Sequence, residues 1–354
     1  MERFFKQLCS VAAVVALLFV TVFSAACTGP HEHEWGEWIK RDGSEHYRVC
    51  NFCNKRQVSK HYYGEWLRTE IEHYKVCEDC GAEQREAHSE GTCSSCAYGF
   101  KVLAFGFDEG GDTAHSDFAR EANVWFPERG KELGFTYEFV GTDYGYLNDD
   151  TLAGYDMVIF LNDRPWTEDR QEAFKRFMDG GGAWMGFHSA AFSMRELGGY
   201  WDWYQDDFLA CGDYAKNTWN PTSEPLFVES FDHPATKNLD DEIFISAPCE
   251  WYGWEYDLFE NEDITVLLTL NPTRENPAGD QPDKTKQYEI WYDGHYPIAW
   301  ANDNYNMVYM NWGHNLQSYN NGAEGKQSST FSSNEQNKFM LDAMYGLVLN
   351  SLNK

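Results

Sequence analysis

The chain has 354 residues, which exceeds the usual size of one domain and predicts two folded units. Its 57 acidic and 28 basic residues give a formal charge of −29, a surface that repels phosphate backbones and argues against nucleic-acid binding. Hydrophobic residues make up 42% of the chain and aromatic residues 17%, too much apolar material for a disordered acidic protein.

The N-terminal segment has the pattern of an export signal. Arg3 and Lys6 precede an apolar run over residues 11–23, which is too short to span a bilayer comfortably, and small residues then lead to Cys27. This ending resembles a bacterial lipobox, although serine occupies the position where leucine is most usual. The resemblance implies that residues 1–26 are a lipoprotein signal peptide and that Cys27 is lipidated, with ordinary signal-peptidase cleavage as the alternative. We therefore expect a protein of the bacterial cell envelope, facing the periplasm or the exterior, that contacts the membrane through its lipid anchor.

Residues 27–97 contain an internal repeat of cysteine and histidine. Two copies, shifted by 27 residues, read His46-x3-Cys50-x2-Cys53-x7-His61 and His73-x3-Cys77-x2-Cys80-x7-His88. A Gly-Glu-Trp sequence precedes each copy, and a third pair follows at Cys93-x2-Cys96. Because a unit this small has few aliphatic residues, it needs cross-links or a metal to hold it together.

The spacing favours structural zinc. Two thiolates two residues apart can reach one ion, and a second cysteine pair or histidines complete a tetrahedron. In a zinc-ribbon pairing, the second and third cysteine pairs share one ion and the first pair recruits histidines such as His33, His46 or His61. Alternatively, each repeat builds its own Cys2His2 site. The expected ligands of this zinc-ribbon-like module are Cys50, Cys53, His61, Cys77, Cys80, His88, Cys93 and Cys96. Disulfides are the other alternative, because an exported chain meets an oxidising compartment, but a bridge inside Cys-x2-Cys closes a small strained ring.

From residue 98 onwards, strands and helices are predicted to alternate. The predicted elements are strand 101–107, helix 117–133, strand 135–140, strand 155–161, helix 167–178 and strand 183–187. Thr167 is expected to cap the second helix. This alternation predicts an α/β domain over residues 98–354, with a parallel sheet covered by helices on both faces. In such sheets the functional groups lie at the carboxyl ends of the strands.

The last predicted strand lies inside a distinctive motif, Gly180-Gly181-Gly182-Ala183-Trp184-Met185-Gly186-Phe187-His188-Ser189-Ala190. This motif resembles the signature of the trehalose-utilisation (ThuA-like) family, which has the flavodoxin-like fold of class I glutamine amidotransferases. Further segments that match in order are His115, Asp232-His233-Pro234, Glu250-x-Tyr252, Pro297-Ile298-Ala299-Trp300 and Gly313-His314. The resemblance covers about residues 100–350, and it implies a role in the catabolism of trehalose or a related sugar, acting on oxidised (keto) sugars or their glycosides.

The turn after the 183–187 strand departs from the amidotransferase pattern. That fold presents a cysteine nucleophile on a strained elbow between strand and helix, whereas this chain has His188 there. An imidazole cannot form the thioester that glutamine hydrolysis requires, so glutaminase activity is excluded. Cys211 and Cys249 lie outside such an elbow and are interpreted as buried thiols or as a disulfide pair.

Histidines and carboxylates near the strand ends are the candidates for chemistry. The expected catalytic residues are His115, His188, Glu250 and His314. Imidazole exchanges protons near neutral pH, and two or three histidines with a carboxylate also bind a divalent metal, so acid/base and metal-dependent mechanisms both stay open. The expected substrate-binding residues are Asp108, Asp163, His233, Trp251, Tyr252 and Trp300. For His233, the Asp-His-Pro sequence also predicts a simple turn.

Aromatic residues crowd the polar loops of the later half, at Trp201, Trp203, Tyr204, Trp219, Trp251, Tyr252, Trp254 and Trp291. Flat rings with polar tips stack on sugars and favour a carbohydrate ligand, with packing inside the domain or across a homo-oligomer interface as the alternative. Residues 271–283 are expected to form a loop that covers the site. Two functions follow: a hydrolase or lyase in which His188 is an acid, a base or a metal ligand, and a non-catalytic surface protein that binds glycans.

Overall fold

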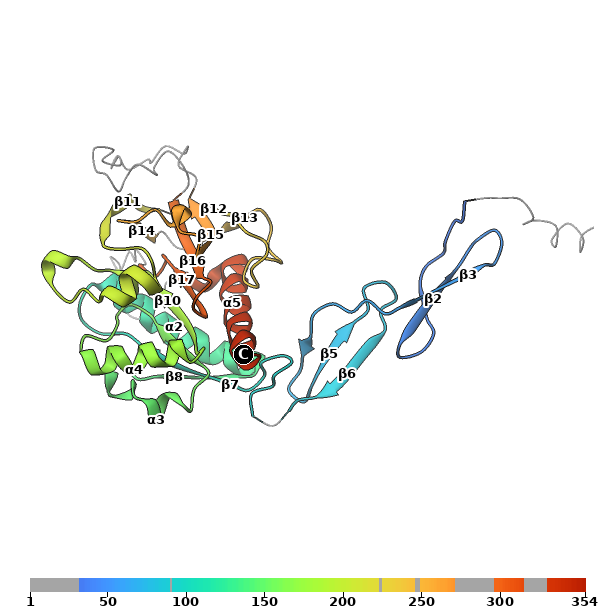
Figure 1. Cartoon of the computed structure of the whole chain (residues 1–354), viewed down its shortest axis with the longest axis horizontal. Helices are drawn as coiled ribbons and strands as arrows, with labels where there is room; N and C mark the ends of the chain where they lie inside the picture. The colour runs from blue at the N-terminus through green and yellow to red at the C-terminus, as the bar shows by residue number, and fades with distance from the viewer. Residues whose placement is uncertain (1–31, 90, 223–224, 246–248, 271–295, 315–329) are drawn as a thin grey trace, which may run out of the picture. The chain divides into compact units, whose positions relative to one another are not determined.

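The computed structural model describes residues 32–89, 91–222, 225–245, 249–270, 296–314 and 330–354. The expected signal peptide, the lipidated Cys27 and the expected loop at 271–283 lie outside the described residues. The chain divides into two compact units, residues 1–87 and 88–354, so the third cysteine pair belongs to the larger unit (Figure 1). In the part of the chain that the structure describes, no helix is both long and apolar enough to cross a bilayer.

The smaller unit contains two copies of a three-stranded antiparallel sheet. The first copy is β1 (Ile39–Lys40), β2 (Glu45–Val49) and β3 (Arg56–Lys60), and the second is β4 (Leu67–Arg68), β5 (Glu72–Val76) and β6 (Glu83–Ala87). In each copy a Cys-x2-Cys turn connects the second strand to the third. The buried apolar residues among the described part of this unit are Cys50, Cys77 and Ala82. Two of these three are cysteines of the repeat, so a hydrocarbon core does not hold this unit together.

A nine-stranded sheet forms the centre of the larger unit, in the order β13-β12-β15-β16-β17-β10-β9-β7-β8 (Figure 1). Its parallel half is β7 (Phe100–Phe105), β8 (Phe135–Phe139), β9 (Met157–Phe160), β10 (Ala183–Phe187) and β17 (Met307–Met310). Its antiparallel half is β12 (Pro225–Val228), β13 (Glu242–Phe244), β15 (Ile264–Leu270) and β16 (Tyr296–Asn302). The predicted α/β fold is confirmed. The antiparallel extension was not predicted; the short turn between β16 and β17 has no room for the crossover that parallel pairing requires.

Helices cover both faces of this sheet, as predicted. The helices on one face are α2 (Thr113–Leu133) and α5 (Asn334–Leu352), and those on the other are α3 (Asp149–Leu152), α4 (Glu168–Asp179) and the π-helical turn η4 (Trp203–Phe208). Along β7, Val102 and Ala104 enter the first core, whereas Leu103 and Phe105 enter the second. This alternation follows from the two-residue period of a strand and explains why the parallel strands read as continuous apolar runs.

The first helix of the larger unit begins four residues earlier than predicted. Asp112 accepts a hydrogen bond from the backbone N–H two residues further on, at 2.8 Å, and so caps α2 at Thr113. His115 therefore lies in the first turn of the helix. Thr167 precedes α4 as expected, but its hydroxyl donates to the Asp169 carboxylate instead of accepting a backbone N–H.

A separate two-stranded antiparallel sheet completes the larger unit. It consists of β11 (Tyr214–Thr222) and β14 (Cys249–Trp254). The Tyr252 backbone N–H of β14 lies 3.4 Å from the side-chain oxygen of Asn311, which directly follows β17. This contact ties β14 to the carboxyl end of the parallel strands, where Glu250 of the same strand can join the groups expected there.

Candidate functional sites

The four residues expected to be catalytic meet at the carboxyl ends of the parallel strands. His188 directly follows β10, His314 follows β17, His115 lies in the first turn of α2 after β7, and Glu250 belongs to β14. Ligand atoms of His115, Glu250 and His314 lie within 4.8 Å of one another. The Glu250 carboxylate is also 3.5 Å from His188 Nε2 and 3.7 Å from His314 Nε2. The structure thus gathers three imidazoles around one carboxylate.

His188 lies on a strained elbow and its ring is held by packing. Its φ of 38° lies in the left-handed region that residues other than glycine rarely adopt, and its side chain is fully buried. The Tyr309 hydroxyl donates to the His188 carbonyl at 2.7 Å, and the Tyr252 ring stacks on the imidazole with centroids 3.9 Å apart. A Cβ at Gly313, which has a φ of 135°, would lie 3.2 Å from the His188 Cβ, so a glycine is needed there.

Asn311 determines which nitrogen of His188 carries the proton. The side-chain N–H of Asn311 donates to the Tyr252 carbonyl at 2.9 Å, and because a carbonyl can only accept, this bond fixes the orientation of the amide. The amide oxygen then faces His188 Nδ1 at 3.3 Å and accepts its proton. Nδ1 is therefore protonated in the neutral ring, and Nε2 presents a lone pair on the side of Glu250.

Burial keeps His115 and His188 neutral. Together with the neighbouring His188 and His314, burial lowers the pKa of His115 to about 3. Burial also lowers the pKa of His188, against the opposing effect of the Glu250 carboxylate. Among the described residues, His115 Nε2, His188 Nε2 and His314 Nδ1 are buried without a hydrogen-bond partner of normal geometry. Buried lone pairs beside a carboxylate that is 20% exposed can bind a divalent metal ion or the polar groups of a substrate.

Asn162 and Asp112 position this cluster and were not predicted. The Asn162 side-chain N–H groups donate to the carbonyls of Phe107 and His115, both at 2.9 Å, and its oxygen accepts from the Phe107 N–H at 2.9 Å. Asp112 caps α2 with one oxygen, and its other oxygen is 4.0 Å from His314 Nε2. Both residues lie in loops that follow parallel strands, which is the sequence signal that could have identified them.

Two of the expected substrate-binding tryptophans are core residues, so that expectation is wrong. Trp251 and Trp300 are completely buried. Trp251 belongs to the core beneath α2 and α5, and Trp300 belongs to the opposite core, where its indole N–H donates to the Leu209 carbonyl at 2.9 Å. Both lie inside strands, where the large rings fill the core instead of facing a ligand.

His233 builds a turn. Its Nδ1 accepts from the Ala235 N–H at 3.2 Å. Burial lowers the pKa of His233 to about 4, partly offset by its charged neighbour Asp303 in the turn before β17. Because β17 runs parallel to β10, that turn lies at the edge of the sheet opposite to His188. The structure therefore favours the turn-building role over substrate binding.

The two expected aspartates have local partners. Asp163 accepts a hydrogen bond from the Trp166 indole at 3.0 Å, and burial raises its pKa. The backbone carbonyl of Asp108 accepts from the Arg120 guanidinium at 2.9 Å. The Asp163 carboxylate therefore has a partner within the protein, whereas the Asp108 contact involves only its backbone.

The other aromatic residues of the later half mostly pack the domain. Trp201, Tyr204 and Trp254 are buried, whereas the side chain of Trp219 and all of Trp291 lie outside the described residues. Trp203 is half-buried, and among the described rings of this set Tyr252 contacts the histidine cluster.

Cys211 and Cys249 are buried in the two opposite cores and do not form a disulfide. Burial raises the pKa of the Cys249 thiol to about 12. They are the buried thiols of the sequence analysis.

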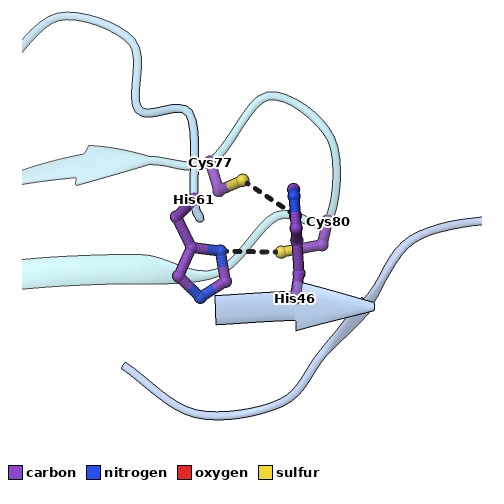
Figure 2. Close-up of side chains that lie close together, drawn as sticks. All are labelled: His46, His61, Cys77 and Cys80. Atoms are coloured by element: carbon purple, nitrogen blue, oxygen red, sulfur yellow. Dashed lines mark hydrogen bonds between the residues drawn. The ribbon is translucent and has the colours of Figure 1, made fainter. Parts of the chain in front are cut away.

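A separate centre in the smaller unit consists of His46, His61, Cys77 and Cys80, whose ligand atoms lie within 4.8 Å of one another (Figure 2). Cys77 Sγ is 3.6 Å from His46 Nδ1, and Cys80 Sγ is 3.4 Å from His61 Nδ1. The histidines belong to the first copy of the repeat and the cysteines to the second. This arrangement corrects both expected pairings, because the turn between β5 and β6 faces β2 of the preceding copy and not the histidine of its own strand.

The other two cysteine pairs also lie beside histidines. Ligand atoms of His33, Cys50 and Cys53 lie within 4.8 Å of one another, with Cys53 Sγ 3.5 Å from His33 Nδ1. In the larger unit, Cys96 Sγ is 3.5 Å from His88 Nδ1. His33 therefore accompanies the first pair, as one of the expected alternatives proposed.

Two of these thiols favour the ionised form that binds metals. Burial opposes ionisation of Cys77, but the Cys80 backbone N–H and the His61 ring outweigh it and lower the pKa to about 6. Cys93 shows the same balance in the larger unit. Burial opposes, and hydrogen bonds from the Ser89 backbone and the His88 ring lower the pKa to about 5.

Known proteins similar to this chain point to one family. Residues 101–326 match the family model described as trehalose utilisation, ThuA. A ThuA-like protein from Bacteroides uniformis shares 28% identity, with 74% of this chain and 94% of that chain covered and a TM-score of 0.59. A ThuA-like protein from Parabacteroides merdae shares 15% identity, covers 70% of this chain and 90% of that chain, and has a TM-score of 0.46. No curated protein matches the chain.

Proposed function

Because the chain belongs to the trehalose-utilisation (ThuA) family, we propose that its larger unit is a metal-dependent lyase for oxidised (keto) sugars or their glycosides. Family membership gives a carbohydrate-related role. The observation that supports the finer proposal is the grouping of ligand atoms from His115, Glu250 and His314 within 4.8 Å, beside the oriented ring of His188.

The chemistry of the donors suits a divalent metal. Neutral imidazole nitrogens and a carboxylate oxygen are ligands of Zn²⁺, Mn²⁺ and Fe²⁺, and three protein ligands leave a coordination position for a substrate oxygen. Burial keeps His115 neutral, so its lone pair is available. A bound ion would polarise the ketone of the sugar. The Glu250 side chain is 20% exposed and that of Asp112 is 54% exposed, so a substrate reaches this cluster from the Asp112 side.

His188 is the proposed base. Its Nε2 lone pair takes the proton from the carbon next to the ketone, and the electrons of that C–H bond form a C=C bond as the glycosidic C–O bond on the following carbon breaks. The departing oxygen takes the proton back from the His188 imidazolium, so the reaction consumes no water and is an elimination. Asn311 keeps Nδ1 protonated throughout, so the same nitrogen receives and returns the proton.

Elimination fits this set of residues better than ordinary glycoside hydrolysis. Hydrolysis of a glycoside uses two carboxyl groups on opposite sides of the bond. Among the described residues of this cluster, Glu250 is surrounded by imidazoles, and one oxygen of Asp112 is occupied as a helix cap. A ketone makes the neighbouring C–H acidic, so a single base with a polarised carbonyl is sufficient.

Metal analysis and turnover on a 3-keto-glucoside test the proposal. We expect the full chain to bind one divalent ion at His115, Glu250 and His314, and to form an unsaturated keto sugar without incorporating ¹⁸O from labelled water. His188→Gln should keep this ion and lose about 100- to 10,000-fold in kcat. His115→Ala and His314→Ala should lose the ion and the activity together. His233→Gln is the matched control, because this histidine lies at the opposite edge of the sheet.

Four results would contradict the proposal. Turnover that persists after complete removal of the ion would show that the reaction does not need the metal. Unchanged kcat in His188→Gln would show that His188 is not the base. Incorporation of ¹⁸O into the sugar replaces elimination by hydrolysis. Sugar binding without turnover by the metal-loaded protein would favour the alternative function, a surface protein that binds glycans.

The proposal includes export and lipid anchoring through Cys27, supported by the charged start, the apolar run at 11–23 and the small residues before the cysteine. Metabolic labelling with a fatty-acid analogue in a bacterial host should mark the wild type in the membrane fraction. Cys27→Ser should lose the label, and a labelled Cys27→Ser chain would refute the assignment.

A further inference from the structure

We propose that His46, His61, Cys77 and Cys80 bind one Zn²⁺ as a closed tetrahedral site, and that this ion fastens the second copy of the Cys/His repeat to the first. The histidines come from β2 and the residue after β3, and the cysteines come from the turn between β5 and β6 (Figure 2). Four protein ligands of this kind leave no position for a substrate, so the site is structural and does not depend on the activity of the larger unit.

The tautomer of the neutral His61 ring favours metal binding. Its Nε2 is 3.0 Å from the backbone carbonyl of Asp42, and because a carbonyl can only accept, Nε2 carries the proton. Nδ1 therefore has a free lone pair, and this is the nitrogen that faces Cys80 Sγ at 3.4 Å. A histidine that ligates a metal through one nitrogen and donates from the other to a carbonyl or carboxylate is the usual arrangement in zinc proteins.

His46 has one ring nitrogen facing a cysteine and the other facing a carboxylate. Its Nδ1 is 3.6 Å from Cys77 Sγ, and its Nε2 is 3.8 Å from the carboxylate of Asp79, which lies inside the Cys-x2-Cys turn. The ring is 1% exposed and Trp38 stacks on it with centroids 4.1 Å apart. The Arg48 guanidinium lies over the Trp38 ring, 4.7 Å from its centroid. The repeated Gly-Glu-Trp sequence thus provides the ring that covers a ligand histidine.

The backbone of the cysteine turn directs both sulfurs to one point. Gly81 follows Cys80 with a φ of 67°, and its N–H donates to the Cys77 carbonyl at 2.8 Å. Asn54 and Ala97 repeat this left-handed conformation directly after the first and third cysteine pairs, with φ of 59° and 58°. The same left-handed turn used after all three cysteine pairs indicates a shared task for the sulfurs. A disulfide within the turn would leave the oriented lone pairs of both histidines without a partner, whereas an ion satisfies all four groups.

The burial pattern explains why an ion is needed here. The buried side chains in the described part of the smaller unit are Cys50, Cys77, Ala82, His46 and His73. Every one except Ala82 is a cysteine or histidine of the repeat. Without a hydrocarbon core, metal binding supplies the folding free energy, as in other small zinc modules.

Zinc content and hydrogen exchange of the full chain test the proposal. The Cys77→Ser, Cys80→Ser double variant should contain one zinc ion fewer than the wild type, whereas Cys211→Ala should contain the same number. Replacement of zinc by cobalt should give the visible d–d bands of a tetrahedral site, which the double variant reduces. Because the ion joins two copies of the repeat, cysteine loss in the second copy should also speed amide exchange in β2 and β3 of the first.

A variant with a milder effect tests the site even if the double variant fails to fold. Asp79→Asn keeps all four ligands and should weaken zinc binding about 10- to 100-fold, measured by competition with a chelator. Unchanged zinc content in the double variant, failure of the metal-free chain to take up added zinc sulfate, or a Cys77–Cys80 disulfide in the freshly purified chain would each overturn the site. If zinc is lost but amide exchange in β2 and β3 stays unchanged, the ion does not hold the two copies of the repeat together.

Discussion

Replacing Asn311 tests whether the orientation of His188 governs activity. Asn311→Leu keeps the approximate size of the side chain and removes its polar atoms. The change leaves the Tyr252 carbonyl and the His188 Nδ1–H, bound at 2.9 and 3.3 Å in the wild type, without their partner in a fully buried place. Each buried group left unsatisfied costs about 1–3 kcal/mol, so the loss of two should lower the free energy of unfolding by about 2–6 kcal/mol.

The same change should affect activity beyond its effect on stability. Without an acceptor at Nδ1, the proton of the neutral His188 ring can move to Nε2, and that tautomer has no lone pair for the substrate. We expect kcat to fall about 10- to 100-fold, the usual effect of removing a residue that orients a catalytic group or ligand, with a smaller change in KM. Asn311 acts through His188, so it is a positioning residue.

Asn306→Leu is the matched control. Asn306 is also buried, and its side-chain N–H donates to the Leu347 carbonyl at 2.7 Å, but it precedes β17 at the opposite edge of the sheet. The control should lose stability of the same order, measured by urea unfolding, and keep its kcat at a temperature where both variants are folded. If the two variants lose kcat to the same extent, or if Asn311→Leu keeps full activity, the tautomer argument is refuted.

Two further predictions concern α2 and the elbow. Burial raises the pKa of Glu121 to about 8, so the native state holds a proton that the unfolded chain, with its ordinary carboxyl pKa of 4.5, has released. The free energy of unfolding should therefore fall between about pH 5 and pH 8, by at most about 1.4 kcal/mol per pH unit. Glu121→Gln should remove this slope in urea titrations, whereas Glu128→Gln, on the exposed side of the helix, should leave it unchanged. Gly313→Ala should lower both the melting temperature and kcat, because the new Cβ meets the His188 Cβ at 3.2 Å at a strained φ; an active, equally stable variant would show that the elbow tolerates it.

Sequence periodicity predicted four of the five parallel strands, and β17 was missed. The strand at 183–187 was predicted to the residue, because a fully buried parallel strand is a continuous apolar run bounded by glycines and a turn. The antiparallel half was missed because, among the described residues, no α-helix lies between its consecutive strands to give the strand–helix alternation that the prediction relied on. The start of α2 was missed because the Asp112 cap overrides the weaker apolar pattern of the first turn.

The ionisable members of the site could be predicted from the sequence, but the side-chain amides that position them could not. His115, His188, Glu250 and His314 stand out by residue type and by their places near strand ends. The amides of Asn162 and Asn311 act through hydrogen bonds to backbone groups far away in the sequence, so no spacing reveals them. The buried Trp251 and Trp300 were wrongly expected to bind substrate, because residue type alone does not show whether a ring is buried. A ring that suits a sugar also suits a core, and burial depends on which face of the strand the residue occupies.

The two units reach metal-ligand geometry by different routes, and the difference follows from what each can bury. In the larger unit two continuous cores fix the sheet, so its edge can hold polar residues with unpartnered lone pairs, such as His188, in a strained conformation. The described part of the smaller unit has no such hydrocarbon core, and its buried residues are mostly the cysteines and histidines of the repeat. Thiolates that bind zinc tightly suit that task, whereas imidazoles and a carboxylate leave positions open for substrate. Chelation should therefore unfold the smaller unit while it only inactivates the larger one, and far-ultraviolet circular dichroism together with an activity assay on the same chelated sample would separate the two effects.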